Sequence, residues 1–297
     1  MLAVGLALLA ALGFAATAIF ARVGMQGVKP LPSTLISLVV GFFPAFLLAL
    51  LFAMPDIRAL PLAGYGWLLG LGALTFIGGR VVSYVAIDLV GASRSSAILG
   101  TGVVFATIFA ITLAGERPHP VLLVGTAGVV IGLVIATGDS IRLGWSRDRL
   151  SILGYLLALV AAASYGGGNV AAKELTEAYG SPLMITAFSL FFGILLLAPI
   201  GGRQALESLW VSGSDLKFTG SAALSGLAAT GAVIFLYYAL QQGDVTLVAP
   251  VASVTPILTL ILAKMFISRI ERVTGQVLVG TVLTVVGVML AVLGSTI

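Results

Sequence analysis

The segment Leu123-Val124-Gly125-Thr126 recurs unchanged as Leu278-Val279-Gly280-Thr281 in the second half of the chain. Self-similarity at a fixed spacing indicates two copies of one structural unit. The same spacing aligns the neighbouring residues: Glu116 and Arg117 with Glu271 and Arg272, Val130 with Val285, Gly132 with Gly287, and Ala136 with Ala291. Earlier in each half, the stretch from Gly13 to Arg22 aligns more weakly with that from Ser164 to Lys173. The two halves therefore share their first and last segments in the same order.

Long uncharged stretches surround these repeated motifs. Of the 297 residues, 60% are hydrophobic and 9% are charged, whereas an ordinary soluble protein has roughly a quarter charged residues. Each stretch approaches the roughly 20 residues that a membrane-spanning helix needs. Each must be helical, because a backbone in lipid has to satisfy its own hydrogen bonds. The sequence predicts an all-α integral membrane protein with ten transmembrane helices at residues 2–22, 31–54, 63–88, 93–114, 119–138, 151–173, 181–202, 217–241, 245–267 and 273–294.

The predicted helices divide into two sets of five. Residues 1–138 form the first repeat, residues 139–150 a connecting loop, and residues 151–297 the second repeat. Because five is an odd number, the second repeat must enter the membrane the other way up. Inverted repeats of this kind are common in secondary transporters, where the substrate binds near the middle of the membrane between the repeats.

Two corners of the predicted bundle carry the most specific motifs. A run from Val103 to Ala114 ends in Gly115-Glu116-Arg117-Pro118, and Thr255-Pro256-Ile257-Leu258 leads towards Glu271-Arg272. Tyr84-Val85-Ala86-Ile87 and Tyr237-Tyr238-Ala239-Leu240 end the third and eighth predicted helices. On these residues the chain resembles the EamA-type branch of the drug/metabolite transporter superfamily over nearly its whole length. The resemblance implies export, or in some members uptake, of small metabolites such as amino acids, of drugs or of sugar derivatives, by alternating access.

Arg80 is the most informative charged residue, because it follows an uncharged run that begins at Ala59 and lies well inside the third predicted helix. An arginine near the bilayer centre costs about 2.5–3.5 kcal/mol on insertion scales, so it should face the bundle interior or a cavity. Its guanidinium group can bind a carboxylate or a phosphate through two hydrogen bonds. The alternative is a structural arginine that reaches the interface or pairs with Asp88, two turns further along the helix.

Polar side chains on several predicted helices can complete a site around this arginine. Ser83 and Tyr84 follow Arg80 on the same helix face, and tyrosines and a glutamine occupy the matching place in the second half. For the tyrosines the alternative is an anchoring role at the membrane interface. The predicted substrate-binding residues are Arg80, Ser83, Tyr84, Tyr165, Asn169, Tyr237, Tyr238 and Gln241.

Glycine and proline mark the positions at which helices can bend. Residues 166–168 are three consecutive glycines in the sixth predicted helix. They indicate either local unwinding that presents Asn169 to a substrate, or close packing of a neighbouring helix. In the fourth helix Val103 stands where the family usually has proline, and glycines flank it, whereas the ninth helix contains two prolines that permit a kink. The predicted hinge positions are Gly100, Gly102, Gly167, Pro250 and Pro256.

The remaining charged residues lie at predicted helix ends. Asp88 and Asp244 occupy matched ends, where each can be a proton site or a helix cap, and Glu116 closes a helix corner. Basic residues concentrate after the odd-numbered helices, so the positive-inside rule places both termini outside, whereas the family resemblance implies termini inside. The sequence leaves the orientation and the oligomeric state open. We expect an integral protein of the inner (plasma) membrane of a prokaryotic cell.

Several function classes are excluded or disfavoured. There is no cysteine, which excludes disulfides, thiolate metal sites and cysteine nucleophiles, and no ATP-binding loop of the Gly-x-x-x-x-Gly-Lys-Ser/Thr type occurs. We predict a secondary transporter in a lipid bilayer for a small molecule, with carboxylate-bearing compounds as candidate substrates and protons as a candidate coupling ion. It is expected to need no cofactor or metal and to bind no nucleic acid. The alternatives are a passive channel and, less favoured, an intramembrane enzyme.

Overall fold

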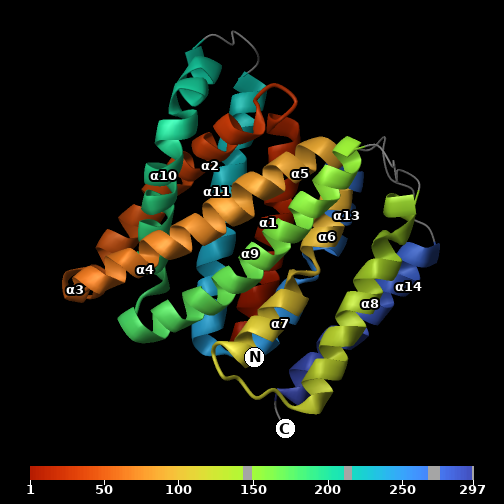
Figure 1. Ribbon diagram of the computed structural model, residues 1–297. Coiled ribbons are helices and arrows are strands. Elements are labelled where there is room, and N and C mark those ends of the chain that lie inside the picture. Colours follow the sequence, from red (N-terminus) through yellow and green to blue (C-terminus); the bar gives the residue numbers. More distant parts are fainter. Residues whose placement is uncertain (143–148, 211–215, 267–274, 296–297) are drawn as a thin grey trace.

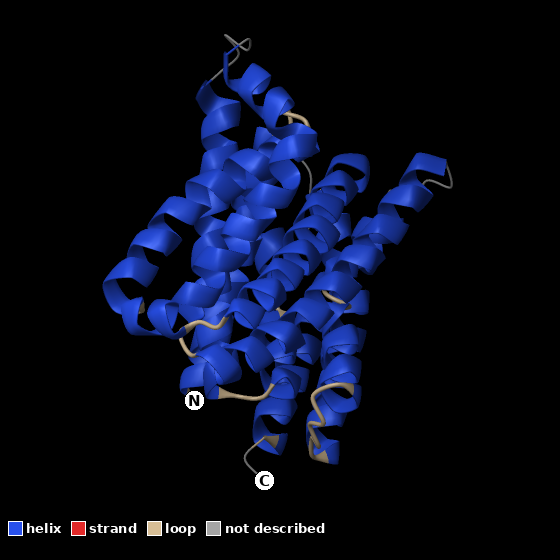
Figure 2. Cartoon of the chain, turned by 60° about the vertical axis from the view of Figure 1, so that its left-hand side comes forward, coloured by secondary structure: helices blue, strands red, loops and turns tan. Residues whose placement is uncertain are grey.

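A computed structural model describes residues 1–142, 149–210, 216–266 and 275–295. The regular elements in these ranges are all helices (Figures 1 and 2). The first half contains α1 (Leu2–Gly24), α2 (Pro30–Phe52), α3 (Met54–Ala59), α4 (Leu62–Gly72), η1 (Ala73–Val81), α5 (Val82–Val90), α6 (Ala92–Leu99), α7 (Gly102–Thr112) and α8 (Pro120–Arg142). The second half contains α9 (Arg149–Tyr179), α10 (Pro182–Trp210), α11 (Leu216–Gln242), α12 (Val245–Ala252), α13 (Thr255–Phe266) and α14 (Gly275–Gly294).

Most of these helices are long and apolar enough to cross a membrane. The described residues contain 8 such segments, three of which consist of consecutive helices: Leu62–Val90, Arg94–Thr112 and Val245–Met265. The predicted fifth and tenth spans fall on α8 and α14, which within the described residues have only shorter apolar segments, Pro120–Ile135 and Val282–Gly294. Large apolar side chains such as Phe43, Leu51 and Met289 are exposed on the outside of the bundle. Such a surface is compatible with lipid rather than with water. The all-helical membrane fold is thus confirmed.

Helices of the first half pack mainly against helices of the second half. The closest pairs are α1 with α11, α2 with α10, α8 with α14, and α9 with the run from α4 to α5. Figure 1 shows α8 and α14 together at one edge of the bundle. Lipid provides no hydrophobic force between helices, so such pairs depend on small residues that allow close approach.

The repeated sequence motif lies in one of these contacts. A side chain on Gly125 would collide with the backbone of Ala291 and Gly287, and one on Gly132 would collide with Thr284. The glycines that aligned the two halves in the sequence therefore face each other across the α8–α14 pair. Their role there is close helix packing.

Two spans are interrupted at matching places. Gly100 and Thr101 separate α6 from α7, and Ser253 and Val254 separate α12 from α13. Hydroxyl groups next to the breaks donate hydrogen bonds to backbone carbonyl oxygens of the preceding turn. Thr101 Oγ1 donates to Ile98 O at 2.6 Å, and Thr255 Oγ1 donates to Ala252 O at 2.7 Å. The sequence had left two alternatives for the glycine cluster of the sixth span, local unwinding and close packing. Helix α9 is continuous there.

Close packing explains that glycine cluster. A side chain on Gly166 would lie 2.7 Å from the backbone nitrogen of Ala106 and 2.8 Å from Cβ of Phe105. Helix α7 therefore approaches α9 at Gly166. A side chain on Gly167 would meet its neighbours at ordinary contact distances of 3.5 Å and above.

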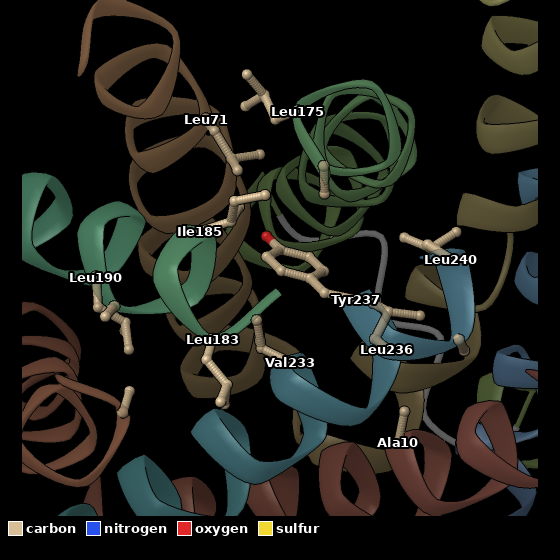
Figure 3. Packing of buried hydrophobic residues seen from close by; sticks show 14 of the residues in the cluster. Ala10, Leu71, Leu175, Leu183, Ile185, Leu190, Val233, Leu236, Tyr237 and Leu240 are labelled. Atoms are coloured by element: carbon tan, nitrogen blue, oxygen red, sulfur yellow. The ribbon is translucent and has the colours of Figure 1, made fainter. Parts of the chain in front are cut away.

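The third span changes its winding in the middle. The nine residues of η1 form a π-helix between α4 and α5, and they include Phe76 and Arg80. Widened turns of this kind are rare and occur frequently at functional sites. The largest buried apolar cluster surrounds this region and joins residues of α4, α9, α10 and α11, among them Leu71, Leu175, Ile185 and Tyr237 (Figure 3).

Candidate functional site

A cavity of about 180 Å³ lies between the two halves. Both halves contribute to its walls, and both helix breaks are part of its lining. Side chains from the first half are Phe14, Thr17, Ala18, Arg80, Ser83, Tyr84, Ile87, Ser96, Leu99 and Val103, with Gly100 and Gly102. The second half contributes Tyr165, Asn169, Ala229, Leu236, Ala249, Ala252, Ser253, Thr255 and Pro256, with Gly166. This cavity is the candidate substrate site.

Arg80 is the one charged residue in this lining. It is 3% exposed, and its Nη1 atom has no hydrogen-bond partner within the described ranges. The guanidinium carbon lies 5.0 Å from the centre of the Phe76 ring, which gives a cation–π contact. None of the ion pairs found among the described residues includes Arg80, and Asp88 is exposed. The alternative ion pair between Arg80 and Asp88 is therefore not formed in the described structure.

Hydroxyl groups surround Arg80. Ser83 Oγ donates to the Arg80 carbonyl at 3.0 Å and lies 3.4 Å from the Tyr165 hydroxyl, which links α5 to α9. The Tyr84 hydroxyl lies 3.2 Å from Ser225 Oγ and links α5 to α11. Tyr84 is 2% exposed, so it is a buried wall residue and not an interfacial anchor. These contacts hold the helix that carries Arg80 against the second half.

A smaller cavity of about 20 Å³ continues from the same place. Arg80, Tyr165 and Asn169 line both cavities, and Thr75 and Tyr237 line the smaller one. Figure 3 shows Tyr237 among apolar side chains of α10 and α11. Six of the eight predicted substrate-binding residues thus lie together: Arg80, Ser83, Tyr84, Tyr165, Asn169 and Tyr237.

The other two predicted substrate-binding residues lie elsewhere. Gln241 is exposed near the end of α11, and Tyr238 is half-buried against the apolar cluster. Neither belongs to the described lining of these two cavities. Tyr238 follows Tyr237 on another face of the helix, whereas Gln241 lies one turn further along, where α11 is exposed.

The predicted hinge residues divide in the same way. Gly100, Gly102 and Pro256 line the cavity at the two helix breaks, and a side chain on Gly100 would lie 3.0 Å from Cγ of Pro256. The two breaks therefore meet across the boundary between the halves. Pro250 is buried inside α12 and Gly167 lies inside the continuous helix α9, so both stand away from the breaks.

Several lining residues carried no distinctive signal in the sequence. Phe14 is one that the internal repeat could have revealed, since it aligns with Tyr165. Ser96, Ser253 and Thr17 are ordinary small polar residues in apolar helices. Only their position at the cavity distinguishes them.

A charged cluster lies beyond the cavity, and we call it the Lys173 cluster: Lys173, Glu116 and Asp244. Lys173 Nζ lies 3.1 Å from Glu116 Oε1 and 2.6 Å from Asp244 Oδ1. The Lys173 and Glu116 side chains are only 11% and 8% exposed. Glu116 also accepts hydrogen bonds from the backbone N–H groups of Val245 at 2.8 Å and Thr246 at 3.0 Å, at the first turn of α12. Sequence reasoning had placed Glu116 and Asp244 at helix ends but had not connected them through Lys173.

The described side chains offer no site for a metal ion, because no three histidine, aspartate or glutamate residues gather among them. The chemistry that the cavity supports is binding. One buried cation, several hydroxyl groups and one amide can orient a small anion against apolar walls.

Comparisons with known proteins identify relatives of this chain. The chain is 24% identical over 302 residues to a "Probable amino-acid metabolite efflux pump" of Escherichia coli (strain K12), a match that covers 97% of this chain and 94% of that protein. A protein of Salmonella typhimurium (strain LT2) with the same name is 23% identical with the same coverage. An uncharacterised protein of Methanocaldococcus jannaschii is 30% identical over 143 residues, which are 48% of this chain but 96% of that protein.

A solved crystal structure has the same fold, with a TM-score of 0.76, 19% sequence identity, and coverage of 99% of this chain and 97% of its own. The model of the EamA-like transporter family matches residues 1–138 and 152–293. The resemblance read from the sequence motifs is thus confirmed, and the family indicates a transporter rather than an enzyme. Together with its apolar helices, this match shows that the chain is an integral membrane protein and belongs to the EamA-like transporter family.

Proposed function

We propose that this protein is a secondary transporter that carries small carboxylate-bearing metabolites, amino acids or related compounds among them, through the cavity between its halves. The observation that carries the proposal is Arg80, a buried cation without an acidic partner in the described structure, located in the wall of a central cavity. Retaining an unpaired charge inside the membrane is costly, so such residues generally mark a substrate or ion pathway. A substrate carboxylate would supply the missing partner.

The predicted substrate-binding residues have separate roles in this proposal. The guanidinium group of Arg80 binds the carboxylate, and the hydroxyls of Tyr165 and Ser83 lie next to it. Asn169 offers an amide to a second polar group of the substrate. No acidic residue belongs to the described lining, so an ammonium group would have to be held by neutral oxygen acceptors. The relatives named as amino-acid metabolite efflux pumps favour amino-acid-like substrates and export.

Alternating access needs two arrangements of the same helices, which an inverted repeat supplies. Three observations support ten spans in two inverted repeats, at residues 1–138 and 151–297. The strong helix contacts between the halves occur in corresponding pairs. For example, the contact of α1 with α11 corresponds to the contact of α9 with α5 when the two halves are exchanged. The two breaks fall at matching places, and the relative from Methanocaldococcus jannaschii has the length of a single repeat. Gly100, Gly102 and Pro256, where the breaks meet, are the proposed bending points.

Binding is tested by thermal unfolding of the purified protein in detergent with a panel of amino acids, other carboxylates and matched amides. A ligand that binds the folded state raises the unfolding midpoint. We expect stabilisation by carboxylates but not by their amides, and its loss in Arg80→Gln. Arg203→Gln is the matched control, because Arg203 is 92% exposed and pairs only with Glu207 among the described residues. Equal stabilisation of the wild type and Arg80→Gln would disprove the site.

Transport is tested in liposomes with the compound that stabilises most strongly. A saturable flux with counterflow indicates a carrier, a conductance indicates a channel, and product formation indicates an enzyme. An imposed proton gradient then shows whether flux is coupled to protons. Fractionation of the host cell, with the inner membrane as the expected location, tests the localisation that the Escherichia coli relative favours.

A further inference from the structure

The Lys173 cluster joins three segments that are distant in the sequence. Lys173 belongs to α9, Asp244 precedes α12, and Glu116 lies in the connection between α7 and α8. Lys173 contacts both carboxylates, and Glu116 in turn accepts two backbone N–H groups at the start of α12. These segments cannot separate without breaking the charge-assisted hydrogen bond between the nearly buried side chains of Lys173 and Glu116, and that between Lys173 and Asp244, whose side chain is 68% exposed. Removing one partner from such a set is costly, because the remaining charge stays buried.

The cluster stands just beyond one end of the cavity. Along α9, Asn169 lines the cavity and Lys173 follows one helical turn later. Along α12, Asp244 precedes the helix and Ala249 is the first residue that lines the cavity. None of the three cluster residues belongs to the lining. At this end the lining therefore stops about one helical turn before the segments that the cluster joins.

The opposite end has a related but different arrangement around Arg22. Along α1, Ala18 lines the cavity and Arg22 follows one turn later, as Lys173 follows Asn169. Arg22 and Lys173 also align in the internal repeat. Arg22 Nη1 donates to the backbone carbonyls of Ile87 at 3.2 Å and Asp88 at 3.5 Å, and it enters no ion pair with the described residues. Ile87 itself lines the cavity, so the cavity extends to the residue that Arg22 binds.

We propose that the Lys173 cluster is an electrostatic latch that holds one end of the cavity closed, and that Arg22 provides the matching latch, with the Asp88 carboxylate as its partner, when the other end closes. The structure then represents the state in which the first latch is formed and the second is not. This inference rests on the proposed alternating access. A two-state transporter needs states of similar free energy, and exchanging one set of charge contacts for a similar set keeps the difference small.

The test uses the absence of cysteine from the chain. Ser253→Cys places a single thiol in the cavity lining. A membrane-impermeant thiol reagent is added to intact cells, and separately to inverted membrane vesicles, and the labelling rate is measured from each face. We expect fast labelling of this background from one face and slow labelling from the other. Adding Lys173→Met should raise the slow rate by about tenfold or more, because the closed end opens more often.

Three further variants complete the design. Arg203→Met, which removes an exposed arginine, should leave both rates unchanged. Arg22→Met should lower the slow rate, since it disfavours the state that opens the Lys173 end. Lys173→Arg, which keeps the positive charge beside Glu116 and Asp244, should keep the slow rate low, which separates the loss of charge pairing from other effects of changing this side chain.

Two results would overturn the latch. One is an unchanged slow rate in Lys173→Met, and the other is a slow rate in Lys173→Arg as high as that in Lys173→Met. Labelling requires no substrate, so these results are independent of the liposome assay. Equal labelling of the Ser253→Cys background from both faces would instead contradict alternating access itself, and with it the latch.

Discussion

At the scale of single residues, Arg80 has opposite consequences for stability and for binding. A buried charge without an acidic partner destabilises the fold, and an apolar side chain of similar length removes that cost. We expect Arg80→Met to raise the free energy of unfolding of the ligand-free protein by about 1–3 kcal/mol and to abolish stabilisation by carboxylates. Thermal unfolding with and without ligand measures both effects. A structural arginine would give the opposite sign in the ligand-free protein.

The sequence revealed Arg80 because a lone charge in a long uncharged run is visible without any structure. The Lys173 cluster was not visible in this way. Lys173, Glu116 and Asp244 each lie near a predicted helix end, where charges are common, and their association depends on three segments meeting in space. Tyr238 and Gln241 show a second limit of prediction from the sequence. Comparison with the third span indicated the right part of α11, but it fixed neither the face that Tyr238 occupies nor the exposure of Gln241 one turn after Tyr237.

At the scale of helices, the glycine cluster of α9 provides a matched pair of variants. Gly166→Ala places a methyl group 2.7 Å from the backbone of α7, so we expect it to destabilise the protein by about 1–3 kcal/mol through overpacking. Gly167→Ala meets only ordinary contacts and should be neutral or stabilising by up to about 1 kcal/mol, because alanine favours helix. Unfolding midpoints of the two variants check this. If Gly167 is instead the predicted hinge, Gly167→Ala should reduce transport without reducing stability.

The first turn of α12 depends on a carboxylate from the other half. Glu116→Gln retains an oxygen acceptor but loses the charge that binds Lys173 and two backbone N–H groups. We expect a loss of about 1.5–3 kcal/mol in stability, the range for hydrogen bonds to charged groups. Glu207→Gln, in the exposed pair with Arg203, should change stability by less than about 1 kcal/mol. Equal losses in the two variants would show that Glu116 adds nothing beyond a surface ion pair.

Helix positions were predictable from uncharged runs, whereas helix breaks were predictable only in part: Gly100, Gly102 and Pro256 lie at or next to the breaks, but Gly167 lies in a continuous helix. The runs placed the membrane-spanning segments because the length needed to cross lipid is fixed. The glycine cluster of the sixth span left unwinding and close packing open in the sequence; in the structure helix α7 packs closely at Gly166 and α9 remains continuous. At the actual breaks, the hydroxyl groups of Thr101 and Thr255 donate hydrogen bonds to nearby backbone carbonyl oxygens. Such local hydrogen bonds leave little trace in hydrophobicity or in composition.

At the scale of the whole molecule, the repeat organises the sequence, but neither half is an independent body. The main helix pairs join the first half to the second, so each half alone would leave small-residue faces such as those of α8 and α14 uncovered. The motif that aligned the halves in the sequence is part of this shared contact. A match to the family model in two segments, and a relative of single-repeat length, are compatible with separate chains that assemble in the membrane.

We therefore expect residues 1–138 and 151–297, expressed as two chains, to assemble, and each chain alone to be degraded or to aggregate. A tag on the first chain should recover the second in equal amount from detergent extracts. Gly132→Leu should prevent this recovery, because a side chain there collides with the backbone of α14 at Thr284. Gly5→Leu is the matched control, since a side chain on Gly5 meets no atom within 4 Å. Two results would contradict this expectation: either half is stable alone as a monomer, or the Gly132→Leu variant assembles as well as the Gly5→Leu variant. In either case, contacts within each half would dominate the fold, and the cavity would not depend on the pairing of the two halves.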